Sequence, residues 1–252
     1  MGQEQQAKNG GAATKVLLTI LILSIAALAF LLWHERVEFY KKMTPELKDS
    51  ELFEDMQSGM SICFVGDSIT AGTETRGIPW YSPIERYIKG DVSNFSYSGW
   101  TTNDVIYWEN DIPAADIYIF AIGINDVLFF NERPAANTTE EYTDNLDTIV
   151  ASIRESSPDA KMYFIAPWPF VNYPNEMVAR REDYSDALRS WCADNGYIFI
   201  EPAPIILPVI EGEDGADYLA DSIHPNRVRG LGLYSYAVLY TEHQRRADGQ
   251  TA

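Results

Sequence analysis

The chain has 252 residues, of which 46% are hydrophobic and 22% are charged, as is normal for a packed globular protein of one domain. Its formal net charge is −18, and the first 49 residues, with six basic and five acidic side chains, contribute +1 to this value. The remainder is therefore strongly acidic and repels phosphate backbones, which excludes nucleic acid as an expected partner.

The N-terminal region contains a long uncharged apolar run. Residues 1–15 are polar and rich in Gly and Ala, so we expect a disordered tail there. The next 18 residues, Val16–Trp33 ("VLLTILILSIAALAFLLW"), carry no charge. A helix of that length spans about 27 Å, which is enough to cross the hydrocarbon core of a membrane. We therefore predict a single transmembrane anchor over residues 16–33.

Two further properties of this run bear on where the protein lies. The small-x-small pattern Ala27-Leu28-Ala29 makes a cleaved signal peptide the competing interpretation, but the apolar run continues past it, which favours an uncleaved anchor. Basic residues flank the run on both sides in similar numbers, so the positive-inside rule does not set its orientation. Because the preceding segment is short and lacks acidic clusters, we expect the following domain to lie outside the cytoplasm.

The rest of the chain divides into a stalk and one domain. Residues 34–58 are charged and mixed in character, which predicts a juxtamembrane helix or stalk, and we expect a domain over 59–246 and a tail at 247–252. Five short runs in the domain are rich in β-branched or aromatic residues and adjoin Gly, Pro or Asn, as strands do. These runs are Ser61–Val65, Val92–Tyr97, Asp116–Ile122, Lys161–Ala166 and Tyr197–Ile200.

Longer segments with helical spacing of apolar residues lie between and after these runs. Helices are predicted over Thr139–Ser156, over Asn175–Asn195 with Gly196 as its C-cap, and from Pro225 to about Gln244. Nearly all-apolar strands that alternate with helices predict an α/β fold, with a parallel sheet covered on both faces. Ligands of such sheets bind at the carboxyl ends of the strands.

Polar groups suited to acyl transfer follow the first and last of these runs. Ser68 follows the first, in "GDSIT", and His224 lies in "DSIHPN", three residues after Asp221. The chain has three histidines, and the other two lie beside the apolar run and near the charged C-terminus, so His224 is the candidate base. Asp221 is close enough to fix the imidazole tautomer, and His224 would then activate Ser68 as a nucleophile.

Two further positions complete a predicted oxyanion hole. The backbone N–H of Ser68, that of Gly99 in "SYSGWTT" and the side-chain amide of Asn125 in "GIND" could aim at one point. The competing interpretations are structural, with Ser68 as a helix N-cap, Gly99 as a turn residue and Asn125 as a turn or cap residue. Asp67 and Asp126 are expected to accept hydrogen bonds from backbone amides of their own loops.

Taken together, the four motifs resemble those of the SGNH/GDSL hydrolases over nearly all of residues 60–245. They occur in the family's order, as "GDSIT", the glycine of "SYSGWTT", "GIND" and "DSIHPN", and "GDSI" is an ordinary departure from the usual "GDSL". The resemblance implies a flavodoxin-like three-layer α/β/α sandwich with a five-stranded parallel sheet. It also implies cleavage of an ester or thioester through an acyl-serine intermediate, with no metal or cofactor.

Aromatic side chains near the same strand ends bear on the substrate. Trp80, Trp100 and Trp168 are expected to bind substrate, because aromatic faces suit sugars and short acyl chains, and packing in the core or rim is the competing interpretation. No long apolar loop follows the motifs to suggest a lipase lid, and together with the anchor this favours removal of O-acetyl groups from a surface or exported glycan. An O-acetyltransferase that modifies a cell-surface polysaccharide with the same triad, and a non-catalytic glycan-binding or assembly module, are the alternatives. Nothing in the sequence favours one oligomeric state.

Overall fold

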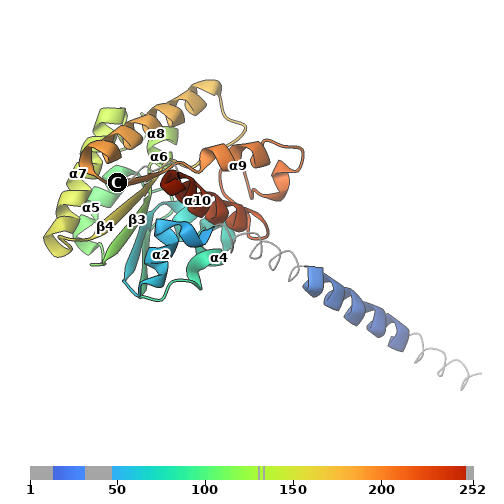
Figure 1. The fold of residues 1–252 in the computed structure, drawn as a ribbon. Helices are drawn as coiled ribbons and strands as arrows, with labels where there is room; N and C mark the ends of the chain where they lie inside the picture. Colours follow the sequence, from blue (N-terminus) through green and yellow to red (C-terminus); the bar gives the residue numbers. More distant parts are fainter. Residues whose placement is uncertain (1–13, 32–46, 130, 133, 248–252) are drawn as a thin grey trace, which may run out of the picture. The chain divides into compact units, whose positions relative to one another are not determined.

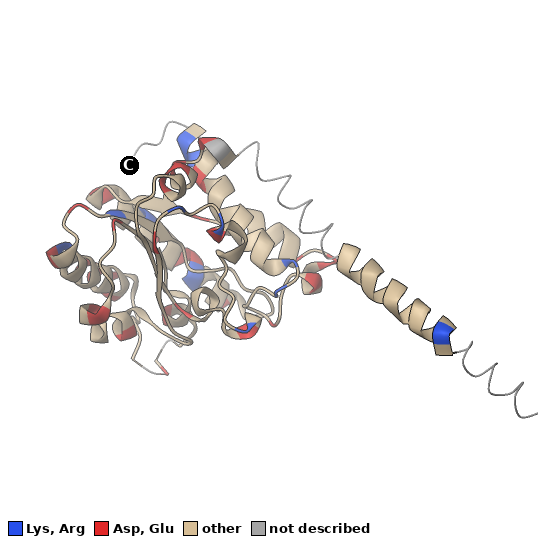
Figure 2. Cartoon of the chain, turned by 90° about the horizontal axis from the view of Figure 1, so that it is seen from below, with Lys and Arg blue, Asp and Glu red and all other residues tan. Residues whose placement is uncertain are grey.

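The computed structural model describes residues 14–31, 47–129, 131–132 and 134–247, and the chain forms two compact units, Met1–Pro45 and Glu46–Ala252. In the first unit, residues 14–31 form one helix that is long and apolar enough to cross a membrane. A signal sequence near an N-terminus has the same length and composition, so both interpretations of this segment stay open. Figure 2 shows that charged residues are confined to the first turn of this helix. The end of the predicted anchor (32–33), the tail at 1–13 and residues 34–46 of the predicted stalk lie outside the described residues.

A five-stranded parallel sheet forms the centre of the second unit, in the order β2-β1-β3-β4-β5 (Figure 1). This is the strand order of flavodoxin-like folds, so the predicted fold class is confirmed. Each predicted run agrees with an observed strand to within one residue at either end. The strands are β1 (Ile62–Gly66), β2 (Val92–Ser96), β3 (Ile117–Ala121), β4 (Lys161–Ile165) and β5 (Ile198–Ile200).

Helices cover both faces of the sheet (Figure 1). On one face lie α5 (Thr102–Tyr107), α6 (Ile124–Leu128), α7 (Thr139–Ser156) and α8 (Asn175–Asn195). On the other face α10 (Gly230–Ala247) contacts α2 (Glu51–Gln57) and α4 (Ser82–Glu85), and α9 (Ala203–Ile210) also contacts α10. The short elements are α3 (Ser68–Ala71) and the 3-10 helices η1 (Leu47–Asp49), η2 (Thr73–Thr75), η3 (Glu109–Asp111) and η4 (Gly215–Asp217).

The central strands are buried on both faces. Cys63 and Val65 of β1 belong to the core under α7 and α8, whereas Phe64 points to the opposite face and stacks on Tyr81 with ring centroids 3.6 Å apart. Side chains alternate in this way because of the pleat of a strand. Every residue of β1 is therefore buried, which explains why the strand is a continuous apolar run in the sequence.

The folded unit begins before residue 59, the boundary that the sequence predicted. The elements η1 and α2 contact α10, and they bury Leu47, Leu52 and Met56 in the second unit. Leu52 and Met56 are four residues apart and share one face of α2, but Leu47 belongs to the separate 3-10 helix η1, so no continuous helical stripe marks these residues in the sequence. The C-terminal part of the predicted stalk is therefore part of the domain.

The long helices α8 and α10 agree with the sequence prediction to different degrees. The helix α8 ends as predicted, because Gly196 adopts a left-handed conformation with φ +70°. The predicted start of the last helix at Pro225 is wrong, since α10 begins at Gly230. The side-chain oxygen of Asn226 accepts hydrogen bonds from the backbone N–H groups of residues 228–230. Such side-chain capture competes with helix formation, so the chain turns there first.

A buried carboxylate on α10 holds α2 in place. Glu242 is fully buried, and its Oε2 accepts a hydrogen bond from the backbone N–H of Leu52 at 3.2 Å. Its Oε1 lies 2.9 Å from Nη2 of Arg245, which also pairs with Glu51 at 2.7 Å. Because a buried charge is costly unless it is paired, these contacts tie the first helix of the domain to the last.

We predict that Glu242→Ala destabilises the domain by about 3 kcal/mol, because it leaves the buried N–H of Leu52 without its acceptor and removes one of the two carboxylates that pair with the largely buried guanidinium of Arg245. Thermal and urea unfolding of the full chain in detergent measure this change. Glu54→Ala is the control, since Glu54 pairs with Arg246 at the surface and its loss should change stability little. Equal losses in the two variants would contradict this role of Glu242.

Candidate active site

Ser68 lies where β1 ends. It is the first residue of α3, and the N-cap of this helix is Asp67, whose carboxylate accepts a hydrogen bond from the backbone N–H of Ile69 at 3.0 Å. A Cβ at Gly66 would collide with the side chain of Thr70, so the tight turn after the strand requires glycine. Asp67, and not Ser68, is therefore the N-cap of α3. Ser68 itself is held at the carboxyl edge of the sheet.

The structure brings Ser68, His224 and Asp221 together in one hydrogen-bonded chain. Ser68 Oγ is 2.8 Å from His224 Nε2, and His224 Nδ1 is 2.7 Å from Asp221 Oδ2. With the carboxylate at Nδ1, the neutral imidazole carries its proton on Nδ1 and offers a free electron pair on Nε2 to the serine hydroxyl. This is the arrangement in which an imidazole can remove a proton from an alcohol.

Backbone amides hold the Asp221 carboxylate in its orientation. Its Oδ1 accepts hydrogen bonds from the N–H groups of Ile223 and His224, both at 2.8 Å. Burial alone would raise the pKa of Asp221, but these two amides and the imidazole lower it below its ordinary value. The carboxylate therefore stays ionised and can stabilise a positive charge on His224.

The loop that carries Asp221 and His224 is anchored from both sides. The backbone N–H of Val171, after β4, donates to the carbonyl of Ser222 at 2.9 Å. The hydroxyl of Tyr234 on α10 donates to the carbonyl of Ile223 at 3.2 Å. Neighbouring elements thus set the position of His224 relative to Ser68.

The two other predicted oxyanion residues follow β2 and β3, the strands on either side of β1. Gly99 has φ +78°, a left-handed conformation that favours glycine, in a turn closed by the bond from Trp100 N–H to Tyr97 O. Asn125 lies in the first turn of α6 and is 6% exposed. Its Nδ2 donates to the carbonyl of Trp100 at 2.9 Å, which links the loops after β2 and β3.

Two buried carboxylates lie close behind these loops. Asp126 accepts hydrogen bonds from the backbone N–H and the hydroxyl of Thr102 at the start of α5 and from the N–H of Ala136, so it joins separate segments and not only its own loop. Asp67 bonds its own loop as predicted, but its Oδ2 has no partner among the described residues. Burial raises the pKa of Asp67 to about 7 and that of Asp126 to about 6, and the charge of Asp126 adds to the shift of Asp67.

The three tryptophans named from the sequence lie in different environments. Trp80 and Trp168 are fully buried, and their rings pack against each other with centroids 5.6 Å apart. Trp100 is half-buried, directly after Gly99 in the chain. The ring of exposed Tyr97 lies 6.0 Å from that of Trp100, and this tyrosine of the same "SYSGWTT" motif was not among the residues predicted from the sequence. Trp100 and Tyr97 are therefore more accessible to a ligand than Trp80 and Trp168.

The raised pKa of Asp67 gives a pH-dependent prediction. The folded chain binds this proton more tightly than an unfolded chain, in which the pKa has its ordinary value of 3.8. The contribution to stability is therefore complete at low pH and is lost as the pH rises towards about 7. Asp67→Asn removes this titration and keeps an oxygen that can cap α3.

We expect the free energy of unfolding of the wild type, relative to Asp67→Asn, to fall by at least about 1 kcal/mol, the equivalent of one pKa unit, as the pH rises from about 4 to about 7. Urea unfolding at several pH values measures it. Parallel curves for the two proteins would show that Asp67 does not titrate in this way.

Comparison with known proteins places this arrangement in a family. No curated protein matches the chain. Among solved structures, the fold is similar to that of Axe2, an acetylxylan esterase from Geobacillus stearothermophilus, with a TM-score of 0.62 and 20% identity over 75% of this chain and 96% of that one. It is also similar to LAE5, an alpha/beta hydrolase enzyme from the metagenome of Lake Arreo, Spain, with a TM-score of 0.57 and 24% identity over 73% of this chain and 95% of that one. The family model of the GDSL-like Lipase/Acylhydrolase family matches residues 64–228, from β1 to just beyond His224. The chain therefore belongs to the GDSL-like Lipase/Acylhydrolase family.

Proposed function

We propose that this protein is a serine esterase of the GDSL type, which cleaves a carboxylic ester through an acyl intermediate on Ser68. The observation that carries the proposal is the unbroken hydrogen-bonded chain from Asp221 through both nitrogens of His224 to the Ser68 hydroxyl, with links of 2.7 and 2.8 Å. A serine hydroxyl is a weak nucleophile alone, and a hydrogen-bonded imidazole is a group that activates it.

Acylation uses each of the three side chains. Ser68 Oγ attacks the carbonyl carbon of the ester while His224 Nε2 takes the hydroxyl proton, and the Asp221 carboxylate stabilises the imidazolium that forms. The tetrahedral intermediate then collapses, and the bond from the carbonyl carbon to the alkoxy oxygen breaks. The alcohol leaves with the proton from Nε2, and the acyl group stays on Ser68.

Deacylation repeats these steps with water. His224 Nε2 takes a proton from a water molecule as its oxygen adds to the acyl carbon. The bond to Ser68 Oγ then breaks, and the serine regains its proton from the imidazolium. The products are a carboxylic acid and the free enzyme. A sugar hydroxyl in place of the water would make the same site a transferase.

Three donors are proposed to stabilise the oxyanion of the tetrahedral intermediate: the N–H groups of Ser68 and Gly99 and the amide of Asn125. An amide NH₂ has two hydrogens, and one of those on Asn125 is engaged by the carbonyl of Trp100. That bond fixes the amide and leaves its second hydrogen for the oxyanion. One such donor contributes about 3 kcal/mol to the transition state.

An O-acetylated glycan is the substrate class we propose. Trp100 and Tyr97 place aromatic surface next to Gly99, and aromatic rings bind the apolar faces of sugars. Axe2, which shares the fold, is an acetylxylan esterase. The buried Trp80 and Trp168 are not part of this proposal, because no substrate reaches them in the observed fold.

The N-terminal helix supports a location at a membrane. Its 18 residues are long and apolar enough to span the hydrocarbon core. We propose a single-pass anchor with the domain outside the cytoplasm, where surface or exported glycans are accessible.

Substitutions in the hydrogen-bonded chain test the mechanism. With p-nitrophenyl acetate and the full chain in detergent, Ser68→Ala should abolish turnover, because the nucleophile is missing. His224→Ala should lower kcat by more than about 10³-fold, and Asp221→Asn by about 10²-fold to 10⁴-fold. Circular dichroism checks that the variants fold. A Ser68→Ala protein of near wild-type activity would exclude Ser68 as the nucleophile.

A separate experiment is needed to show whether water or a sugar hydroxyl takes the acyl group from Ser68, and whether glycans are the substrate. The protein is incubated with acetylated xylooligosaccharides, and in parallel with bare oligosaccharides and p-nitrophenyl acetate as acetyl donor, and both are followed by mass spectrometry. We expect loss of acetyl in the first reaction and no gain in the second. A gain in the second would identify a transferase, and no change in either, with p-nitrophenyl acetate still hydrolysed, would exclude these glycans as substrates.

A further inference from the structure

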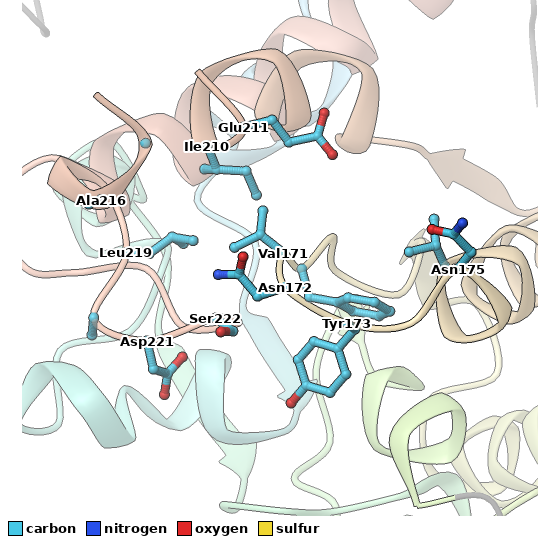
Figure 3. A pocket seen from close by; sticks show the side chains of 14 residues that line it. Val171, Asn172, Tyr173, Asn175, Ile210, Glu211, Ala216, Leu219, Asp221 and Ser222 are labelled. Carbon is cyan, nitrogen blue, oxygen red and sulfur yellow. The ribbon is translucent and has the colours of Figure 1, made fainter. Parts of the chain in front are cut away.

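A cavity of about 760 Å³ lies beside Asp221, outside the hydrogen-bonded chain described above (Figure 3). Three segments surround it: the loop after β4 with the start of α8, the end of α9 with η4, and the loop that leads to the triad. This volume is in the range of pockets that bind small organic molecules, and it is large enough for a sugar residue. The mechanism proposed above does not use this space.

The cavity adjoins the reaction centre. Asp221 and Ser222 form part of its wall, and the carbonyl of Ser222 is bonded to the backbone N–H of Val171, another wall residue. Only one imidazole ring and two hydrogen bonds separate the Asp221 carboxylate from Ser68 Oγ. That separation is short compared with the length of two linked sugar rings. A molecule esterified near Ser68 can therefore extend into the cavity.

The polar groups of the wall match hydroxyl groups. Asn172 and Asn175 offer both donors and acceptors, and Glu211 offers acceptors, whereas both oxygens of Asp221 already accept hydrogen bonds from Ile223 and His224. Figure 3 shows Asn172 in the middle of this set, with Glu211 on the opposite side of the cavity from Tyr173. Burial and the charge of Asp221 raise the pKa of Tyr173, so its hydroxyl remains a donor. A sugar, whose hydroxyls donate and accept, can satisfy all of these groups.

The apolar part of the wall is also suited to a sugar ring. Val171, Ile210 and Leu219 contribute aliphatic surface between the polar groups. Pockets that bind small molecules commonly combine such surface with a few polar groups that fix orientation. A long acyl chain suits the cavity less well, because it would remove Asn172, Glu211 and Asp221 from water without offering them hydrogen bonds.

The charge of the wall bears on the class of sugar. Glu211 and Asp221 are acidic, and none of the described residues that line the cavity is Lys or Arg. A ligand carboxylate, sulfate or phosphate would meet two negative charges with no compensating cation. The lining therefore selects against anionic sugars.

We infer that this cavity is a subsite for a neutral sugar residue of the substrate, adjacent to the residue whose ester is cleaved at Ser68. This inference rests on the proposed function and adds to it. The enzyme acts on neutral oligosaccharides in preference to monosaccharides, and Asn172 and Glu211 determine that preference. They bind the substrate at a distance from the reacting atoms and do not take part in the chemical steps.

The structure offers a matched pair of variants for Asn172. This residue has φ +62°, so Asn172→Gly removes the side chain and leaves a residue that tolerates the backbone conformation. Asn131 has φ +57° and does not line the cavity, so Asn131→Gly is the control. The substrates are fully acetylated xylobiose and cellobiose, the corresponding acetylated monosaccharides, and p-nitrophenyl acetate, with the full chain in detergent.

For the wild type we expect kcat/KM to be about tenfold higher for at least one disaccharide than for its monosaccharide, the equivalent of about one hydrogen bond. Asn172→Gly should remove this preference through KM, and should leave p-nitrophenyl acetate hydrolysis within about twofold of the wild type. Asn131→Gly should retain both. Absence of the preference in the wild type, or equal losses on all substrates in Asn172→Gly, would overturn the inference.

Glu211 tests the selection by charge. Glu211→Lys should increase kcat/KM for acetylated digalacturonate relative to acetylated xylobiose, because it places a cation in the wall. Glu213→Lys is the control, since Glu213 lies two residues away and does not line the cavity. An equal change of this kcat/KM ratio in the two variants would mean that the net charge of the protein determines the preference, and would contradict a binding site at the cavity.

Blocking the cavity separates the sugar subsite from an acyl pocket. Ala216 is an exposed residue of the wall, so Ala216→Trp should narrow the cavity without disturbing the core. We expect slower hydrolysis of the acetylated disaccharides and an unchanged ratio of p-nitrophenyl octanoate to p-nitrophenyl acetate activity. Selective loss of octanoate hydrolysis would show that the cavity holds the acyl chain and would overturn the inference. Loss of p-nitrophenyl acetate activity in Ser68→Ala tests the esterase proposal separately.

Discussion

The hydrogen bond between Ser68 Oγ and His224 Nε2 joins two residues that are 156 positions apart in the chain. Its length of 2.8 Å requires that the end of β1 and the loop before α10 are both fixed. The capped turn at Gly66 and Asp67 fixes the serine, and contacts from Val171 and Tyr234 fix the loop of the histidine. The parallel sheet is the common support, because strand ends that converge on one edge bring such distant segments together.

The same edge of the sheet includes two buried carboxyl groups, whose burial lowers the stability of the folded domain when they are charged. Asp67 and Asp126 are buried carboxylates with raised pKa values, and one oxygen of Asp67 has no partner among the described residues. Asp126 compensates by accepting hydrogen bonds that join Thr102 and Ala136 to the loop of Asn125. Proteins commonly break the rules of stable packing at functional sites and compensate elsewhere. The hydrogen bonds of Asp126 therefore help to fix Asn125, which precedes it in the chain and is one of the proposed oxyanion donors.

The sequence predicted those features that depend on local pattern. Buried strands such as β1 read as apolar runs, and the strand ends then gave Ser68, Asp221 and His224 as one cluster. Features that depend on packing were either not predicted or stood only as the competing interpretation, as core packing did for the tryptophans. The burial of Trp80 and Trp168 arises from contacts with other aromatic rings, which their positions in the chain do not reveal. The late start of α10 likewise depends on the hydrogen bonds that the side chain of Asn226 accepts from the backbone. The cavity beside Asp221 is formed by three segments that are distant in the chain.

The central claim is that His224 activates Ser68 as the nucleophile. Labelling with a fluorophosphonate, which reacts covalently with activated serines, followed by peptide mass spectrometry tests it most directly. We predict one label, on the peptide that contains Ser68, at a rate that falls steeply in His224→Ala and not in Asn131→Gly. A label on a different serine, or an equal labelling rate in His224→Ala and the wild type, would contradict the account.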